Sequence, residues 1–198
     1  MNMKGFTLIE TMVAITILTL AVAGPLFTAS RAIVAAQTAR DQLTALYLAQ
    51  EGIEYVRAMR DNEYLAAYQE GGTDVSSRAW GNFLSNEVLG KCRVEEHTSK
   101  ICTLGSVLEG APLRSCPSDN CGPLYLTGCT NSPEGPSCTP PNIYTQENLP
   151  GSVRTPFTRT IQAADVASNE IKIISTVSWV FHGTPYSVAV SDHLTSWH

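Results

Sequence analysis

The sequence lacks the short motifs that mark many catalytic sites. It contains no Gly-x-Ser-x-Gly nucleophile turn, no phosphate-binding loop and no His-Glu-x-x-His zinc motif. The four histidines are too dispersed along the chain to suggest a metal site: His97, His182, His193 and His198. We therefore expect no enzymatic activity, no metal and no cofactor.

A basic patch is also missing. The 18 acidic and 13 basic side chains are scattered along the chain and give a formal net charge of −5. Binding to nucleic acid depends on clustered lysine and arginine side chains that neutralise phosphates. The charge pattern therefore predicts no nucleic-acid partner.

Charged residues are nearly absent from the first thirty positions. Between Phe6 and Ser30 the single charged side chain is Glu10. A helix of about 25 residues is roughly 37 Å long, which is enough to cross a ~30 Å hydrocarbon core. Residues 6–30 are therefore predicted to form a transmembrane helix, with Lys4 on the cytoplasmic side. A carboxylate in such a helix costs on the order of 2.5–3.5 kcal/mol at the bilayer centre and less near an end, so Glu10 requires a partner.

The segment Lys4-Gly-Phe-Thr-Leu-Ile-Glu10, placed ahead of an apolar helix, resembles the prepilin leader of the type IV pilin family. The resemblance implies that a prepilin peptidase cuts between Gly5 and Phe6 and that Phe6 is then N-methylated. Glu10 matches the family's assembly glutamate. The new amino group on Phe6 of a neighbouring subunit would be the cation that Glu10 needs.

The same resemblance implies an organisation of the chain and a set of partners. Residues 1–5 would be the cleaved leader, 6–30 the transmembrane and assembly helix, and 31–198 a pilin-like domain outside the cytoplasm. The partners would be the prepilin peptidase, other pilin or pseudopilin subunits, the inner-membrane assembly platform and the membrane. The protein would first be a single-pass inner-membrane protein and would then enter a pilus or pseudopilus.

Two other kinds of membrane-targeting segment compete with this interpretation. An ordinary secretory signal could end at the small residues Ala21-Val22-Ala23, but the apolar run continues beyond them and Glu10 would be an unexplained charge. A plain single-pass anchor would have the same topology and would give Gly5, Phe6 and Glu10 no special role. A lipoprotein is excluded because no cysteine lies near the amino terminus.

Gly24-Pro25 falls within the apolar run. Pro25 cannot donate a hydrogen bond to the carbonyl of Ala21, and its ring crowds that group, so a kink or break is expected there. The resemblance to pilins adds that residues around Val22–Leu26 would unwind when the subunit packs into a filament.

The helical pattern continues well beyond the apolar run. The stretch from Ala29 to Tyr68 has no proline and only one glycine, Gly52, and Gly71-Gly72 is the expected end of the helix. This predicts one helix of about sixty residues. Apolar residues at spacings of three and four predict a stripe that packs against a globular domain: Leu43, Leu46, Ala49, Ile53, Val56 and Met59.

Alternating apolar residues in the last forty-five or so positions predict strands. One begins at Phe157–Ile161, a second covers Ile171–Phe181, and a third covers Tyr186–Leu194. Asp165–Asn169 and His182-Gly183 are the expected turns. The sequence therefore predicts an α+β fold in which the amphipathic half of the long helix covers an antiparallel meander.

Residues 73–151 form a segment of different composition that contains all six cysteines and eight of the eleven prolines. One short helix around Trp80–Leu89, short strands at Cys92–Val94 and Ile101–Leu104, and an ordered loop over Cys116–Pro141 are expected. An even number of cysteines outside the cytoplasm predicts disulfides, and fifteen pairings are possible. The candidates are Cys92, Cys102, Cys116, Cys121, Cys129 and Cys138. A zinc site is the alternative, but Cys-x2-Cys pairs are missing.

Two classes of function follow. The first is a structural subunit of a type IV pilus or secretion pseudopilus, as a minor component. The second is a membrane-anchored, pilin-like binding module that presents its cysteine-rich loops to a surface, a sugar or DNA, because loops on a rigid scaffold often carry function.

Overall fold

The computed structural model describes residues 7–85, 88–93, 100–105, 113–116, 120–132, 135–138 and 143–196. For 129–132 and 135–138 the backbone alone is described. The chain divides into two compact units, Met1–Leu43 and Thr44–His198. Helix α1 (Leu8–Glu70) contributes residues to both units.

Helix α1 is 63 residues long, which confirms the single long helix predicted from the sequence. It ends where the glycine pair was expected to stop it. Gly71 and Gly72 have φ angles of 71° and 100°. Glycine adopts these angles without steric cost, and the helix therefore ends at Glu70.

The helix is continuous across Gly24 and Pro25. Proline removes the intrahelical donor to the carbonyl of Ala21. One turn further along, the Thr28 hydroxyl donates to the carbonyl of Pro25 at 2.9 Å and lies 3.3 Å from that of Gly24. The position of the expected kink or break is thus helical here, and unwinding of this segment in a filament stays a prediction.

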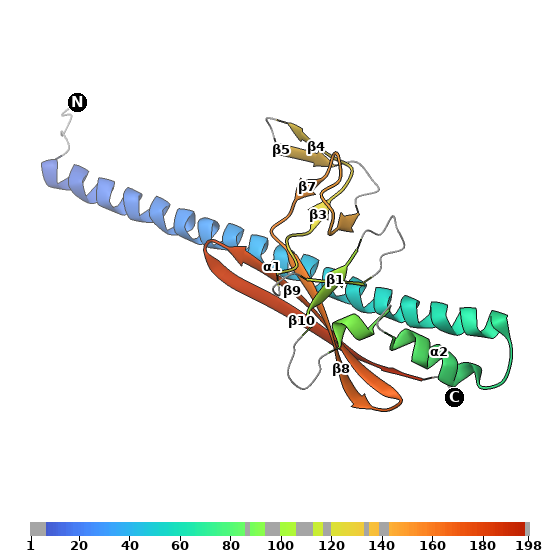
Figure 1. Cartoon of the computed structure of the whole chain (residues 1–198). Coiled ribbons are helices and arrows are strands. Elements are labelled where there is room, and N and C mark those ends of the chain that lie inside the picture. The colour runs from blue at the N-terminus through green and yellow to red at the C-terminus, as the bar shows by residue number, and fades with distance from the viewer. Residues whose placement is uncertain are drawn as a thin grey trace. The chain divides into compact units, whose positions relative to one another are not determined.

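The second unit is built on a five-stranded antiparallel sheet in the order β10-β9-β8-β1-β2 (Figure 1). The strands are β1 (Cys102–Leu104), β2 (Leu113–Ser115), β8 (Thr158–Ala167), β9 (Glu170–Phe181) and β10 (Thr184–Thr195). Strands β8, β9 and β10 pair in sequence, which confirms the predicted meander and the α+β class.

The two turns of the meander differ in how well they were predicted. His182 and Gly183 both have positive φ, at 49° and 80°, as a two-residue hairpin turn requires. The loop expected over Asp165–Asn169 is shorter than predicted, because β8 continues to Ala167, which pairs with Glu170. The pairing of β8 with β9 is irregular between Asp165 and Ala167. The strand therefore continues beyond the residues whose apolar alternation predicted it.

The core lies between the sheet and the part of α1 from Thr44 onward. Every second residue of β9 is buried from Ile171 to Trp179. The helix residues buried against the sheet side of the unit are Ala45, Leu48, Ala49, Gly52, Ile53 and Val56. Of the predicted stripe, Ala49, Ile53 and Val56 are buried, whereas Leu46 is half-buried and Leu43 is 55 % exposed.

Helix α2 (Val75–Phe83) begins and ends earlier than the short helix expected around Trp80–Leu89. It lies beside the last turns of α1 (Figure 1). Arg78 fixes it there by donating to the carbonyls of Ala67 at 2.7 Å and Gly71 at 2.8 Å. Carbonyls at the C-terminal end of a helix lack intrahelical donors, and Arg78 supplies donors to these two.

The remaining elements correct the predictions for the cysteine-rich segment. Cys92 lies in a 3-10 turn, η1 (Gly90–Cys92), rather than in a strand, whereas the strand expected at Ile101–Leu104 is confirmed as β1. The loop expected over Cys116–Pro141 contains strands, namely β3 (Tyr125–Leu126), β4 (Cys129–Ser132) and β5 (Gly135–Cys138). Strand β3 pairs with β6 (Tyr144–Thr145) and β7 (Val153–Arg154). Strands of two to four residues are too short to show a period in the sequence.

Two disulfides stabilise the second unit. Cys92 in η1 is bonded to Cys102 in β1, and Cys116 to Cys121. These bonds remove four cysteines from the zinc alternative. In the pairing of β4 with β5, Cys129 and Cys138 are directly opposite each other.

Candidate functional site

Glu10 lies in the first turn of α1 and is the acidic residue of that turn. The helix starts after Thr7, whose carbonyl accepts hydrogen bonds from the backbone N–H groups of Glu10 at 3.1 Å and Thr11 at 3.2 Å. The Thr7 hydroxyl is 3.4 Å from the same N–H of Glu10. Threonine is a favoured residue at a helix start, and a carboxylate in the first turn is stabilised by the helix dipole.

The Glu10 side chain is exposed. Within the described ranges it makes no ion pair and no side-chain hydrogen bond. No described residue therefore supplies the partner that the Glu10 carboxylate would require in an apolar surrounding.

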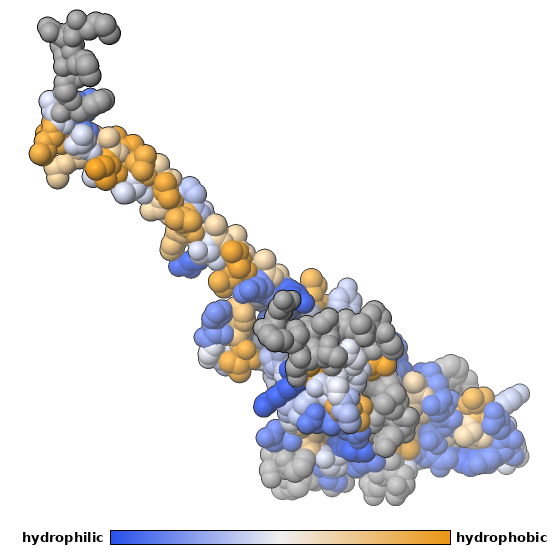
Figure 2. Space-filling view, turned by 90° about the horizontal axis from the view of Figure 1, so that it is seen from above, coloured by the Kyte–Doolittle hydropathy of each residue, from blue (hydrophilic) through white to orange (hydrophobic). Residues whose placement is uncertain are grey.

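The large side chains of the N-terminal part of α1 are apolar and exposed. Figure 2 shows apolar side chains following one another along the N-terminal part of α1. The large exposed ones between Leu8 and Phe27 are Leu8, Ile9, Met12, Val13, Ile15, Ile17, Leu18, Leu20, Val22, Leu26 and Phe27. A helix that is apolar all round belongs either in a protein core or in a membrane.

The helix is long and apolar enough to cross a bilayer, and its most apolar window is 0 % buried within the protein. A core helix of a soluble protein would be mostly buried, so this observation favours the membrane. A signal sequence near the amino terminus has the same properties.

The polar side chains of this segment are satisfied inside the helix. The hydroxyls of Thr11, Thr16 and Thr19 donate to the carbonyls three residues earlier, at 2.8, 2.8 and 2.9 Å. Polar groups in a bilayer must find their partners within the protein. Apart from Glu10, the first half of the segment thus carries no side chain that needs an external polar contact.

Gly5 and Phe6 lie outside the described residues, so cleavage between them and methylation of Phe6 stay predictions. Gly24 and Pro25 are described and lie within α1. The candidate cysteines are in the second unit, where two of the predicted disulfides are formed.

A buried ion pair joins the second part of α1 to the sheet. Arg159 of β8 is 0 % exposed and donates from Nη1 to a Glu51 carboxylate oxygen at 2.7 Å and to the carbonyl of Leu48 at 3.2 Å. Burial lowers the pKa of the Arg159 guanidinium, while the charge and hydrogen bond of Glu51 oppose that shift. Sequence analysis placed Arg159 in a strand and gave it no partner. The sequence feature that could have indicated a buried ion pair is the arginine at position 159, which alternates with the buried residues Phe157 and Ile161.

In the part of the chain that the structure describes, no group of three or more His, Cys, Asp and Glu side chains could hold a metal ion. The buried cation in the described residues is the Arg159 guanidinium, and the Glu51 carboxylate compensates its charge.

Residues 1–24 match the family model described as the prokaryotic N-terminal methylation motif. This motif is the prepilin-type leader of type IV pilins and pseudopilins. No curated protein and no solved structure matches the chain. The motif supports a type IV pilin-like or pseudopilin-like subunit, and it implies processing by a prepilin peptidase and assembly with other pilin subunits. The leader and the apolar helix are together consistent with membrane anchoring.

Proposed function

We propose that this chain is a structural subunit of a type IV pilus or a related secretion pseudopilus. It assembles through residues 6–30 after cleavage between Gly5 and Phe6 and N-methylation of Phe6. The observation that carries the proposal is the methylation motif over residues 1–24, together with helix α1, which begins within the motif at Leu8 and has exposed apolar side chains in its N-terminal part. The exposed, unpaired carboxylate of Glu10 supports the same conclusion.

The physical argument for Glu10 is one of selectivity. Helices that leave a bilayer for a filament core exchange one apolar surrounding for another, so hydrophobic burial barely distinguishes the two states. A hydrogen bond to a charged group contributes about 1.5–3 kcal/mol, and an unpaired buried charge costs more. Pairing of Glu10 with the methylated amino group of an adjacent subunit would therefore provide both attraction and axial register.

The proposed role is that of a minor subunit. A subunit repeated along a whole filament has neighbours on every side, whereas one used at a few positions has surface left for irregular segments. Residues 73–151 supply such a segment, with the disulfides Cys92–Cys102 and Cys116–Cys121. Disulfides persist in oxidising compartments, which supports a location of residues 31–198 outside the cytoplasm.

Mass spectrometry of the mature amino terminus tests the proposal. We expect a chain that begins with N-methylated Phe6. Because the peptidase must accommodate a small residue before the cut, Gly5→Leu should leave the precursor uncut and in the membrane. Gly24→Leu is the matched control, since a side chain at Gly24 meets no atom within 4 Å, and it should be processed normally. A mature chain that begins at Gly24 would establish ordinary signal cleavage and overturn the proposal.

A further inference from the structure

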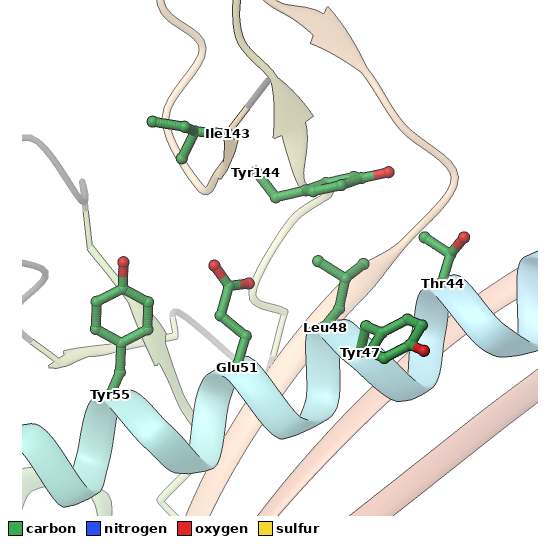
Figure 3. A pocket seen from close by; sticks show the side chains of 7 residues that line it. All are labelled: Thr44, Tyr47, Leu48, Glu51, Tyr55, Ile143 and Tyr144. Carbon is green, nitrogen blue, oxygen red and sulfur yellow. The ribbon is translucent and has the colours of Figure 1, made fainter. Parts of the chain in front are cut away.

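A cavity of about 600 Å³ lies between α1 and the segment that carries β6, within the second unit (Figure 3). Its volume falls in the range of small-molecule sites. Seven side chains line it: Thr44, Tyr47, Leu48, Glu51, Tyr55, Ile143 and Tyr144. The cavity is far from Glu10 in sequence and uses neither the leader nor the disulfide-bonded cysteines.

Three of the lining residues are tyrosines. Figure 3 shows Tyr55 and Glu51 rising from α1 toward the segment of Ile143 and Tyr144, with the Tyr144 ring above Leu48. Tyr47 is 67 % exposed, so its ring is available to a ligand. A tyrosine offers a flat apolar face together with a polar hydroxyl at its edge.

Glu51 supplies the polar centre of the cavity. One carboxylate oxygen accepts the hydrogen bond of Arg159, and among the described residues the other makes no hydrogen bond. The carboxylate side chain is 33 % exposed, whereas the arginine side chain beneath it is 1 % exposed. The cavity therefore presents a fixed acceptor whose charge is already compensated from behind.

These features exclude several classes of ligand. An organic cation gains little from a carboxylate that Arg159 has already neutralised, and an anion meets the carboxylate before the buried arginine. A wholly apolar ligand would cover the free Glu51 oxygen and leave it without a partner. A neutral ligand with apolar faces and several hydroxyl donors satisfies all the lining groups.

We propose that this cavity binds a neutral saccharide. The apolar face of the sugar ring stacks on the tyrosine rings, and the sugar hydroxyls donate to the free oxygen of Glu51. The Tyr55 hydroxyl forms a hydrogen bond with a sugar hydroxyl. The site goes beyond the role of a filament subunit and does not depend on assembly. It also differs from a binding module that presents cysteine-rich loops, because its polar group and two of its tyrosines come from α1.

Saturation-transfer NMR on the full chain in phosphatidylcholine nanodiscs tests the proposal, since sugar-based detergents would compete. The probes are the methyl glycosides of glucose, galactose and N-acetylglucosamine, with tetramethylammonium as the cationic probe. We expect transfer to at least one glycoside and none to tetramethylammonium. Tyr47→Ala should weaken glycoside binding by about fivefold or more, because it removes an exposed stacking surface.

Tyr68→Ala is the matched control, because Tyr68 is on the same helix, 77 % exposed and outside the cavity. It should bind as the unchanged chain does. Tyr55→Phe removes one hydroxyl and keeps the ring, and it should also weaken glycoside binding. This variant provides the test if Tyr47→Ala does not fold. Absence of transfer to all three glycosides at about 10 mM, a preference for tetramethylammonium, or equal loss in Tyr47→Ala and Tyr68→Ala would overturn the proposal.

Discussion

Arg159 and Glu51, 108 positions apart in the sequence, form an ion pair of 2.7 Å that links β8 to α1. The guanidinium is buried, and its Nη1 also donates to the Leu48 carbonyl. Next to Glu51, Gly52 allows the helix to approach the sheet closely, since a Cβ there would lie 2.5 Å from the Ser175 hydroxyl oxygen. The buried ion pair and the close approach at Gly52 thus add to the apolar contacts, and to the ion pair of Arg57 with Asp192 of β10, that hold α1 on the sheet.

Glu51→Ala should destabilise the second unit by about 3–5 kcal/mol, because it leaves the buried charge of Arg159 without compensation. Urea unfolding of the full chain, followed by tryptophan fluorescence, measures the change. The double variant Glu51→Leu, Arg159→Met should recover most of this loss, since it removes both charges and fills the space.

Glu54→Ala is the control for that series, because its ion pair with Arg57 is exposed and such pairs contribute about 0–1 kcal/mol. Equal losses for Glu51→Ala and Glu54→Ala would show that the buried pair has no special weight.

Gly52→Ala should destabilise the protein by about 1–3 kcal/mol despite the better helix propensity of alanine, because the new methyl group overlaps the Ser175 side chain. The combination with Ser175→Ala should restore stability. Ser175 is buried, and its hydroxyl has no hydrogen-bond partner among the described residues. Gly81→Ala in α2 meets no atom within 4 Å and should be neutral or stabilising. A stable Gly52→Ala chain would show that the helix can move away from the sheet at little cost.

Glu10→Ala should be cleaved and inserted normally but should fail to co-purify with partner pilin subunits, since the methylated amino group of the neighbour loses its acceptor. Thr16→Ala is the control on the same helix, because its hydroxyl is bonded to the Val13 carbonyl. It should co-purify at wild-type level. Wild-type recovery of mature, methylated Glu10→Ala with its partners would exclude a role for Glu10 in assembly.

Cys129 and Cys138 should form a third disulfide. They are the two cysteines left after Cys92–Cys102 and Cys116–Cys121, and they are directly opposite in the β4–β5 pairing. Opposite residues on antiparallel strands have Cα atoms about 4.5–5.5 Å apart, which is within the Cα separation of a disulfide. Peptide mapping under non-reducing conditions should recover a linked pair. Alkylation of two thiols in the denatured, unreduced chain would contradict the prediction.

The sequence predicted the long helix and the three long strands because each has a period that persists over many residues. It also predicted the exposed apolar segment and its lone carboxylate, since both depend on composition alone. It misplaced α2 and missed β2 to β7, where two to nine residues are too few for a period to dominate. The partner of Arg159 was beyond reach for a different reason, because no local pattern connects residues 108 positions apart.

The cavity shows the same limit. Tyr47, Glu51 and Tyr55 follow one another at spacings of four on α1, a pattern that a sequence reader assigns to one exposed helix face. Tyr144 comes from a two-residue strand whose position depends on the pairing of β6 with β3. A site built by such distant pairing becomes visible only when the fold is known.

The internal bonding of Thr11, Thr16 and Thr19 has an energetic consequence for reversibility. In the proposed transfer of this helix from lipid to a filament core, these hydroxyls would neither lose nor gain a partner, and the apolar side chains would meet surroundings of similar polarity. The free-energy difference between the two locations then depends mainly on the Glu10 carboxylate. Because a contact to a single charged group contributes about 1.5–3 kcal/mol, the proposed addition of this subunit to a filament would be reversible.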